Sequence, residues 1–578
     1  MKMFKYKSRE FNSMDKNLIL KYALQNAVKF GKANAGAVIG KVVSENPDAK
    51  NNMKELAKEI NEVIKEISKL SNEAQLEKLK EIAPELLEKK EHEERAELKE
   101  LEDIPKTGVI MRFAPSPSGP MHIGHAITGG LTSLYVKKYG GKFILRIEDT
   151  NSDNIDMNAY KMIPKDGEWI FGNVSEVWIQ SDRMQIYYDY AEKFIKLNAV
   201  YVCTCSQEQF KKYADDSEDC PCRNNSIEDN LKKWKMMFDK ENGFKEGEAV
   251  VRFKSGMQDK NPAMRDFPLI RINDSEHPRQ GLKYRVWPLM NMCVTVDDIE
   301  AGMTHIIRAK EHADNAKRQE KMYGALGIAD KFPKTYFLGR YNFEGLEISC
   351  SKTKARIKAG EFWGWDDIRI PFLAALKRKG YQPEAFMKYT KLTGLSPVDK
   401  TITAEEFFKV IDSFNKEIID KTSKRFFFVY DYEKIKINNA PKQKLKLKMH
   451  PTADLGFREL EVHDEFYIQK DDLKDLKEGE LYRLMDCLNF RKSGNEFAFD
   501  STEHEKFKNH GKKIMHFLPI ENNVEIEIMM NDASVIKGLA ENNIKNLKVG
   551  EVMQFERFGF CRLDKIENKK YYFWFTHK

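Results

Sequence analysis

Apolar and charged residues alternate along the first hundred positions with the spacing of amphipathic helices. Apolar side chains recur three and four residues apart, at Met53, Leu56, Ile60 and Val63, which places them on one helix face. Lysine and glutamate fill the opposite face, as is typical of a solvated surface. We therefore expect a helical N-terminal extension over residues 1–104.

The pattern changes after Pro105. An apolar run over residues 109–113 has the length of a buried strand, and a proline-rich loop and a helical pattern follow it. A second apolar run spans residues 143–147, and the sheet is expected to resume around residues 283–312, with residues 294–298 as one of its segments. Strand, helix and strand in this order form a βαβ unit with parallel strands. We expect a doubly wound α/β domain over residues 105–340, with a further insertion at about 200–282.

The C-terminal part divides by periodicity into two regions. Helical spacing predicts a mostly helical connector over residues 341–424. Short alternating segments separated by turn residues predict strands from residue 425 to 578. An all-β region after an α/β region indicates a separate domain, and we expect one or two β-barrels there. The predicted protein is thus multidomain.

Composition narrows the class of protein. A chain of 578 residues can form several domains, each with its own core. A net charge of +7 permits polyanion binding through local patches without requiring it. No apolar run has the length of a membrane span, and the N-terminus lacks a signal-peptide pattern. We expect a cytoplasmic protein with no membrane partner.

The most informative stretch is residues 112–126, RFAPSPSGPMHIGHA. His122 and His125 flank a predicted helix N-terminus, where backbone N–H groups and the helix dipole favour an anion. Gly124 leaves space for a phosphate beside the backbone. Two imidazoles there can stabilise charge that develops at phosphorus. No P-loop motif occurs in the chain.

This string resembles the first signature of class I aminoacyl-tRNA synthetases, within the glutamyl and glutaminyl branch. The resemblance implies a Rossmann-like domain that activates an amino acid with ATP and Mg²⁺. The substrate carboxylate attacks phosphorus, so positioning and charge neutralisation dominate. Ligands on parallel sheets lie beyond the C-terminal strand ends. Arg112 there is expected to bind a substrate carboxylate, Glu148 the ammonium, and Ser116 to make a lesser contact.

Residues 347–356, EISCSKTKAR, resemble the second class I signature, a mobile Lys-Met-Ser-Lys-Ser loop. Ser351 and Lys352 align with its final Ser-Lys, whereas Ser349 replaces its first lysine. Cations on a flexible loop can follow the leaving pyrophosphate. The resemblance implies that Ser351 and Lys352 bind the phosphates together with the two histidines and the glycine of the first signature.

Arg308 lies at the end of an apolar run that is predicted to form a strand, and it affects which amino acid the site can bind. In register with the family it separates two amino acids, because a glutamate side chain needs a guanidinium to offset its desolvation and glutamine does not. Glutaminyl enzymes lack arginine at this place. Whether Arg308 or Arg112 binds the side-chain carboxylate stays open. Many relatives have tyrosine where this chain has Met290, and Trp287 and Asn291 are candidates to replace its hydroxyl.

Four cysteines form two close pairs near residue 210. The spacing is Cys-x-Cys, fourteen residues, then Cys-x-Cys, and the members are Cys203, Cys205, Cys220 and Cys222. Four thiolates presented from two turns suit a structural tetrahedral zinc, while four reduced thiols without metal are the alternative. The segment resembles an inserted α/β region of archaeal-type glutamyl enzymes that contacts the tRNA acceptor end.

Two further stretches carry the resemblance toward the chain ends. Residues 549–560 resemble the C-terminal segment of archaeal glutamyl and of glutaminyl enzymes, which implies that the barrels read the anticodon. Residues 26–41 resemble the N-terminal extension of such enzymes, which implies an accessory contact with RNA.

The sequence as a whole resembles the archaeal type of glutamyl enzyme. The resemblance implies an ATP-dependent enzyme, expected to be a monomer, that attaches L-glutamate to the 2′-OH of tRNA(Glu). Whether it also misacylates tRNA(Gln) stays open at this point. A glutaminyl enzyme and a non-catalytic tRNA-binding paralogue are the alternatives. Arg308 argues against the first, and the retained histidines and Lys352 argue against the second.

Overall fold

The computed structural model describes residues 13–31, 33–46, 49, 52–86 and 97–578. The chain divides into two compact units, Met1–Arg95 and Ala96–Lys578. Parts of the predicted extension, 1–12 and 87–96 among them, lie outside the described residues. Residues 97–104 contain no helix, so the helical stretch ends earlier than the sequence pattern suggested.

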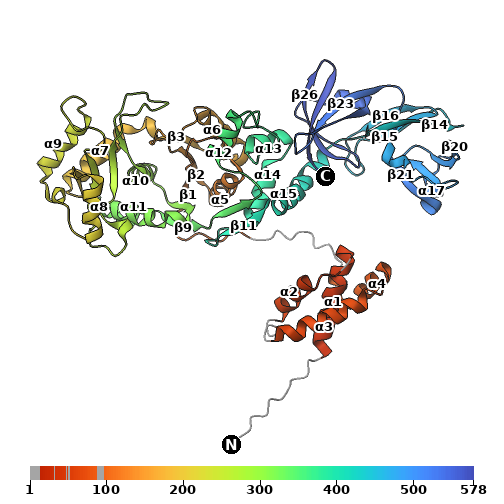
Figure 1. Ribbon diagram of the computed structural model, residues 1–578, viewed down its shortest axis with the longest axis horizontal. Helices are drawn as coiled ribbons and strands as arrows, with labels where there is room; N and C mark the ends of the chain where they lie inside the picture. Colours follow the sequence, from red (N-terminus) through yellow and green to blue (C-terminus); the bar gives the residue numbers. More distant parts are fainter. Residues whose placement is uncertain (1–12, 32, 47–48, 50–51, 87–96) are drawn as a thin grey trace, which may run out of the picture. The chain divides into compact units, whose positions relative to one another are not determined.

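The first unit consists of helices around a small apolar core (Figure 1). Leu56 and Ile60 are fully buried in it, as their spacing predicts, whereas Met53 of the same series is exposed. The side chain of Asn34 caps the second helix, and that of Ser71 caps the fourth. The helices are α1 (Ser13–Phe30), α2 (Ala35–Glu45), α3 (Met53–Ile67) and α4 (Asn72–Ile82).

The second unit begins with a parallel sheet. β1 (Val109–Phe113), β2 (Gly141–Ile147) and β3 (Glu176–Ile179) pair in parallel. β8 (His305–Ala309) pairs in parallel with β9 (Lys334–Leu338). Just before β8, the Thr304 N–H donates to the carbonyl of Ile110 in β1 at 3.0 Å, so the two groups of strands adjoin. This arrangement confirms the predicted Rossmann-like α/β domain.

Helices pack against this sheet through small residues. α5 (Ile123–Tyr139) contacts β1 and β2. A methyl group at Gly129 of α5 would lie 2.3 Å from the Phe171 ring, so glycine permits the close approach. The other helices of this domain are α6 (Ala159–Phe171), α10 (Met290–Glu300) and α11 (Ala313–Ala325).

One segment expected in the sheet is helical instead. Residues 294–298, Val-Thr-Val-Asp-Asp, have the β-branched composition of a strand but lie within α10. Every residue from Asn291 to Asp298 is buried. A helix buried on all sides shows no amphipathic period, which explains why the sequence pattern was misleading.

The expected insertion is a small α/β region. β4 to β7 form one antiparallel sheet, on which α7 and α9 pack. The strands are β4 (Val200–Cys203), β5 (Val250–Phe253), β6 (Pro268–Ile272) and β7 (Val286–Pro288). The helices are α7 (Met184–Lys196), α8 (Gln207–Asp216) and α9 (Ile227–Phe238).

The connector is mostly helical and also contributes one strand pair. β10 (Tyr341–Glu344) pairs with β11 (Lys400–Thr403). A threonine capping box opens the last helix, through Thr403 and Glu406. The helices are α12 (Cys350–Lys358), α13 (Leu373–Lys379), α14 (Pro383–Thr393) and α15 (Ala404–Ile419).

The C-terminal region is built on β-sheets, as predicted (Figure 1). One seven-stranded sheet combines β12 (Arg425–Phe426), β25 (Val552–Phe555), β26 (Gly559–Glu567), β27 (Lys570–His577), β23 (Asn523–Met529), β24 (Val535–Glu541) and β13 (Phe428–Tyr430). The other combines β21 (Gly511–Met515), β18 (Leu481–Leu484), β19 (Asn489–Ser493), β20 (Glu496–Ser501), β14 (Tyr432–Asn438), β17 (Glu465–Gln469) and β22 (Leu518–Pro519).

Three smaller elements complete this region. They are the hairpin of β15 (Gln443–Lys448) and β16 (Phe457–Val462) and the short helices α16 (Lys470–Leu473) and α17 (His504–His510). Among the described residues, no helix combines the length and the apolar character that a bilayer crossing requires.

Candidate active site

The C-terminal ends of β1, β2 and β8 border an open cavity of about 530 Å³. Parallel strands bring their C-terminal ends to one edge of a sheet, where ligands bind. Six residues singled out from the sequence line this cavity: Arg112, His122, Gly124, His125, Glu148 and Arg308. Residues from separate motifs thus meet at one place.

The two histidines form the start of α5. The Gly124 N–H donates to Nδ1 of His122 at 3.1 Å, and the His122 N–H donates to Nδ1 of His125 at 3.3 Å. Each Nδ1 is therefore an acceptor, which assigns the proton of the neutral ring to Nε2. A methyl group at Gly124 would lie 3.0 Å from the His122 ring, so glycine is needed to leave this ring in place.

Both imidazoles are neutral near pH 7. Burial lowers the pKa of His125 to about 4. Burial, and then the charge of His125, hold the pKa of His122 well below its ordinary value. The rings stack with centroids 3.7 Å apart. The pair therefore offers neutral Nε2–H donors to an anion rather than two positive charges.

Arginines and carboxylates form a buried network beneath the cavity. Arg112 Nε lies 3.1 Å from Oδ1 of Asp298, and Arg146 Nη1 donates to the same oxygen at 2.7 Å. Arg146 Nη2 also donates to Glu148 at 3.1 Å. Burial raises the pKa of Asp298, but the charges of Arg112 and Arg146 outweigh it and hold that pKa below its ordinary value. This carboxylate stays ionised.

Arg308 has no carboxylate within salt-bridge distance in the described part of the chain. Its Nη1 donates to Oε1 of Gln319 at 3.0 Å, and its buried Nε has no hydrogen-bond partner among the described residues. Burial, together with the charge of Arg112, lowers the pKa of Arg308 to about 10. Arg308 is therefore a charged, buried group with hydrogen-bonding capacity left at the cavity.

Three predicted residues lie outside the cavity lining. Ser116, in the loop after β1, is exposed. Ser351 and Lys352 lie in the first turn of α12 and are also exposed, so the segment expected as a loop is here a helix N-terminus. Nζ of Lys352 lies 3.4 Å from Oε2 of Glu347. In this conformation the structure brings neither residue to the histidines.

The two signature segments nevertheless pack together. The Ile123 N–H donates to the carbonyl of Pro371, and the Leu373 N–H donates to that of Met121. A methyl group at Gly119 would lie 3.1 Å from Sγ of Cys350. The segment that follows α12 therefore supports the loop that carries the histidines.

One of the two residues expected to replace the missing tyrosine hydroxyl at Met290 is connected to the cavity. Met290 lines the cavity, while Asn291 is buried and accepts from Gln319 at 3.3 Å. Trp287 is buried against His277, with ring centroids 4.9 Å apart, and does not line the cavity. Of the two candidates, only Asn291 is connected to the site.

Sequence reasoning missed three members of the site: Arg146, Asp298 and Gln319. A signal for two of them existed. Arg146 stands inside the apolar run of β2, and Asp298 follows the apolar run of α10. A charge within a buried element requires a partner, so both residues could have been marked in advance as members of a buried charged site. Gln319 carries no comparable signal, because it lies on a mostly polar helix.

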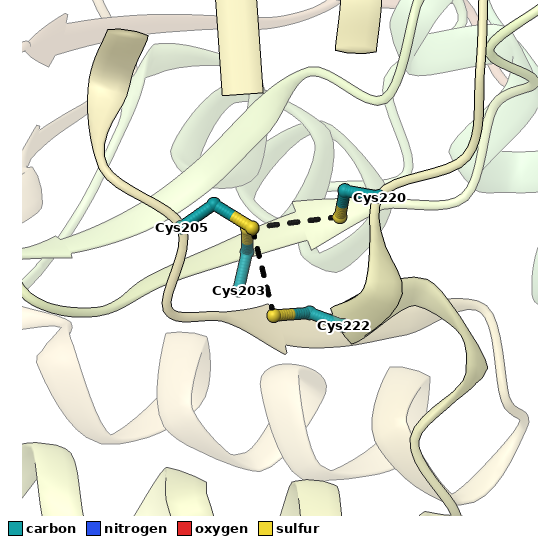
Figure 2. Close-up of side chains that lie close together, drawn as sticks. All are labelled: Cys203, Cys205, Cys220 and Cys222. Carbon is teal, nitrogen blue, oxygen red and sulfur yellow. Dashed lines mark hydrogen bonds between the residues drawn. The ribbon is translucent and has the colours of Figure 1, made fainter. Parts of the chain in front are cut away.

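The four cysteines converge, as their spacing predicted (Figure 2). Sγ of Cys203 lies 3.9 Å from that of Cys220, and Sγ of Cys205 lies 3.8 Å from that of Cys222. All four sulfur atoms lie within 4.8 Å of one another. A tetrahedral zinc with Zn–S bonds of about 2.3 Å requires S···S distances near 3.8 Å. The donor set and its geometry fit that ion.

Three family models match the chain. Residues 108–421 match the catalytic domain of class I tRNA synthetases (E and Q). Residues 423–510 and 507–564 match two anticodon-binding domains of the same enzymes. The catalytic match spans the cavity and both signature segments, and the other two matches span most of the β region.

Curated relatives match almost the whole chain. A glutamate--tRNA ligase of Methanococcus maripaludis (strain C7) is 40% identical over 97% of this chain and 100% of its own length. Those of Methanocaldococcus jannaschii and Pyrococcus furiosus are also 40% identical, over 97% of this chain and 99% of theirs. From these matches and the site geometry, the chain belongs to the class I tRNA synthetases (E and Q).

Proposed function

We propose that this protein attaches L-glutamate to tRNA(Glu) through a glutamyl-adenylate, using ATP and Mg²⁺. The relatives at 40% identity are named glutamate--tRNA ligase, and the catalytic match covers the cavity. The observation that carries the proposal is Arg308, a buried guanidinium without a carboxylate partner at the cavity wall.

The net charge of the site favours glutamate over glutamine. Free glutamate carries two carboxylates and one ammonium near pH 7, and glutamine carries one of each. The charged network beneath the cavity, in which Arg183 and Glu148 are partly exposed, contains one more guanidinium than carboxylates. Its members are Arg112, Arg146, Arg183 and Arg308 against Glu148, Asp297 and Asp298. A ligand with one net negative charge therefore balances the site.

The partners of each arginine suggest how the substrate lies. Both Nε and Nη2 of Arg112 contact Asp298, whereas Arg308 keeps a buried donor without a partner. We assign the side-chain carboxylate to Arg308 and the α-carboxylate to the neighbourhood of Arg112. Glu148, which is partly exposed, is the acceptor for the substrate ammonium.

The phosphates of ATP are assigned to the start of α5. Gly124 permits close approach, and the neutral His122 and His125 donate from Nε2. Ser351 and Lys352 join them only if α12 shifts toward the cavity, and Lys352 then leaves Glu347. Mg²⁺ would be bound mainly by the ATP phosphates, as is usual for this ion.

The remaining parts take the roles expected from the resemblance. We propose a catalytic domain over 105–340, a connector over 341–424 and an anticodon-binding region over 425–578, in a monomer. The extension over 1–104 is assigned an accessory contact with RNA. The insertion at about 200–282 is assigned to the acceptor end.

A structural zinc is proposed at the four cysteines. Four thiolates complete a tetrahedral ion and leave no open position, so the metal would stabilise the insertion without taking part in catalysis. Metal analysis should give one zinc per chain, and Cys220→Ser with Cys222→Ser should lose it and lower the melting temperature. A metal-free protein of unchanged stability would reject the site.

The decisive experiment is aminoacylation of separate tRNA(Glu) and tRNA(Gln) transcripts with labelled glutamate and labelled glutamine. Glutamate transfer without glutamine transfer supports the proposal, and charging of both tRNAs would identify an enzyme that does not discriminate between them. Transfer of glutamine would instead favour the glutaminyl activity.

A further inference from the structure

We infer that Gln319 is a positioning residue for substrate choice, because its neutral amide orients the Arg308 guanidinium toward a carboxylate without neutralising its charge. The inference rests on the proposed glutamate activity and extends it to a residue that neither signature contains.

Gln319 is held in one orientation by neighbours on both sides. It lies on α11, is 2% exposed, and accepts from Arg308 Nη1 through Oε1 at 3.0 Å. Its Nε2 donates to Oδ1 of Asn291 at 3.3 Å, and Nδ2 of Asn291 donates to Oδ1 of Asn315 at 3.2 Å. Arg318 donates to that same Oδ1 at 3.1 Å.

This chain of amides has only one self-consistent direction. An arginine can only donate, so Gln319 must present its oxygen to Arg308 and its nitrogen to Asn291. At the other end, Arg318 fixes the oxygen of Asn315 in the same way. Flipping any amide would oppose two donors or two acceptors, so Gln319, in the wall of the cavity, holds the Arg308 guanidinium in one orientation.

The absence of a negative charge on the side chain at position 319 is important for this role. A carboxylate there would form an ion pair with Arg308 and replace the substrate carboxylate. An amide oxygen fixes the same geometry and leaves the positive charge uncompensated. The lowered pKa of Arg308, which burial and Arg112 cause, is consistent with such a charge.

Selectivity against glutamine follows from this arrangement. A substrate carboxylate can accept from the guanidinium of Arg308, which lines the cavity. A glutamine amide brings no charge and leaves the buried guanidinium without compensation, which is costly. A site built to pair a charged group therefore rejects the uncharged isostere.

Two substitutions separate orientation from charge. Gln319→Glu keeps an acceptor and adds a negative charge, whereas Gln319→Met keeps the volume and removes the acceptor. Gln185→Glu makes the same charge change at an exposed position of α7 and is the matched control. The full chain is assayed by aminoacylation of tRNA(Glu) transcript, with KM for glutamate and for ATP, kcat, and inhibition by glutamine.

We expect Gln319→Glu to raise the KM for glutamate roughly 100-fold and Gln319→Met roughly 10-fold, the range for a hydrogen bond to a charged group. The KM for ATP should stay within about twofold in both. Glutamine should compete better against glutamate in both variants than in the unmodified protein. Gln185→Glu should leave every value unchanged.

Two results would overturn the inference while leaving the proposed function intact. One is an unchanged KM for glutamate in both variants. The other is an equal rise in KM for glutamate and ATP with a lower melting temperature, because Gln319 would then have a structural role only. If the unmodified protein transfers no glutamate, the proposed function itself is wrong, and this inference fails with it.

Discussion

Two arginines share one carboxylate under the cavity, and a third has none. Arg112 and Arg146 both contact Asp298, while the one side-chain hydrogen bond of Arg308 to the described residues goes to the neutral Gln319. A buried charge is costly unless it is paired. The free protein therefore carries an electrostatic cost at Arg308 that a bound carboxylate offsets, which couples stability to substrate binding at the level of single residues.

Arg308→Ala should abolish the attachment of glutamate to tRNA and leave the binding of ATP unchanged. Losing the partner of a buried carboxylate costs about 3–5 kcal/mol, so the KM for glutamate should rise at least 100-fold. The KM for ATP should change less than twofold. Arg279→Ala is the control, since that arginine is half-exposed and paired with Asp182 away from the cavity lining. Unchanged glutamate kinetics would contradict the assignment.

Asp166 should make stability depend on pH. Burial raises its pKa to about 7, although the Met121 N–H donates to it at 3.1 Å. A carboxyl whose folded pKa is raised contributes its stability at low pH and loses it as the pH rises through about 7. Asp166→Asn keeps an acceptor and cannot ionise. The difference in melting temperature, Asp166→Asn minus the unmodified protein, should therefore increase from pH 5 to pH 8. A difference that stays constant over this range would show that the pKa of Asp166 is not raised.

Among the elements, α5 shows how glycine residues set the distance between a helix and the side chains that pack against it. It connects the phosphate-binding turn to the sheet, and Gly129 lies against the Phe171 and Phe113 rings. Gly130 faces Thr390 of α14 in a similar way. Close packing on both sides fixes the depth of the helix and hence the position of His122 at its start.

Two glycine-to-alanine substitutions should change the stability of the protein in opposite directions. At Gly129 a methyl group would meet Phe171 at 2.3 Å, so overpacking should destabilise the protein by about 1–3 kcal/mol. At Gly324, in α11, nothing lies within 4 Å. Gly324→Ala should stabilise by about 0.5–1 kcal/mol through helix propensity. Chemical denaturation of both variants tests this, and equal effects would contradict the packing argument.

At the scale of the whole second unit, Arg378 makes the most extensive side-chain contacts between the connector and the β region. Arg378 of α13 binds both oxygens of Asp564 in β26, at 2.8 and 2.7 Å, and Asp366 at 2.7 Å. Its guanidinium lies 4.1 Å from the Trp574 ring centroid. Thr576 also donates to the carbonyl of Lys379. The β region is thus attached directly to the helix that supports the first signature.

Arg378→Ala should loosen this junction. Loss of a bidentate pair and a cation–π contact is expected to cost about 1–3 kcal/mol. In calorimetry the β region should then unfold at a lower temperature than the catalytic domain. Lys388→Ala, which removes an exposed pair with Glu417, is the control and should change little. A single unshifted transition in Arg378→Ala would contradict a coupling role.

The elements were predictable where the local pattern has a period. The parallel strands of 109–113 and 143–147, the helical extension and the C-terminal β region all follow from the spacing of apolar residues. The pattern failed at 294–298, where a fully buried helix has no polar face. At Ser351 and Lys352 a resemblance rather than the pattern implied a loop, and a helix capped by Ser349 begins there instead. At 294–298 tertiary contacts, rather than local preference, select the backbone.

The sequence by itself determined which chemical groups are present and to which strand end each belongs. Arg112, Glu148 and Arg308 each follow a short apolar run, and chain order is enough to place them on one rim. Only the tertiary structure decided how the charges are shared. Asp298 is taken by two arginines and Gln319 faces the third, because pairing depends on distances between segments far apart in the chain, which no local pattern encodes.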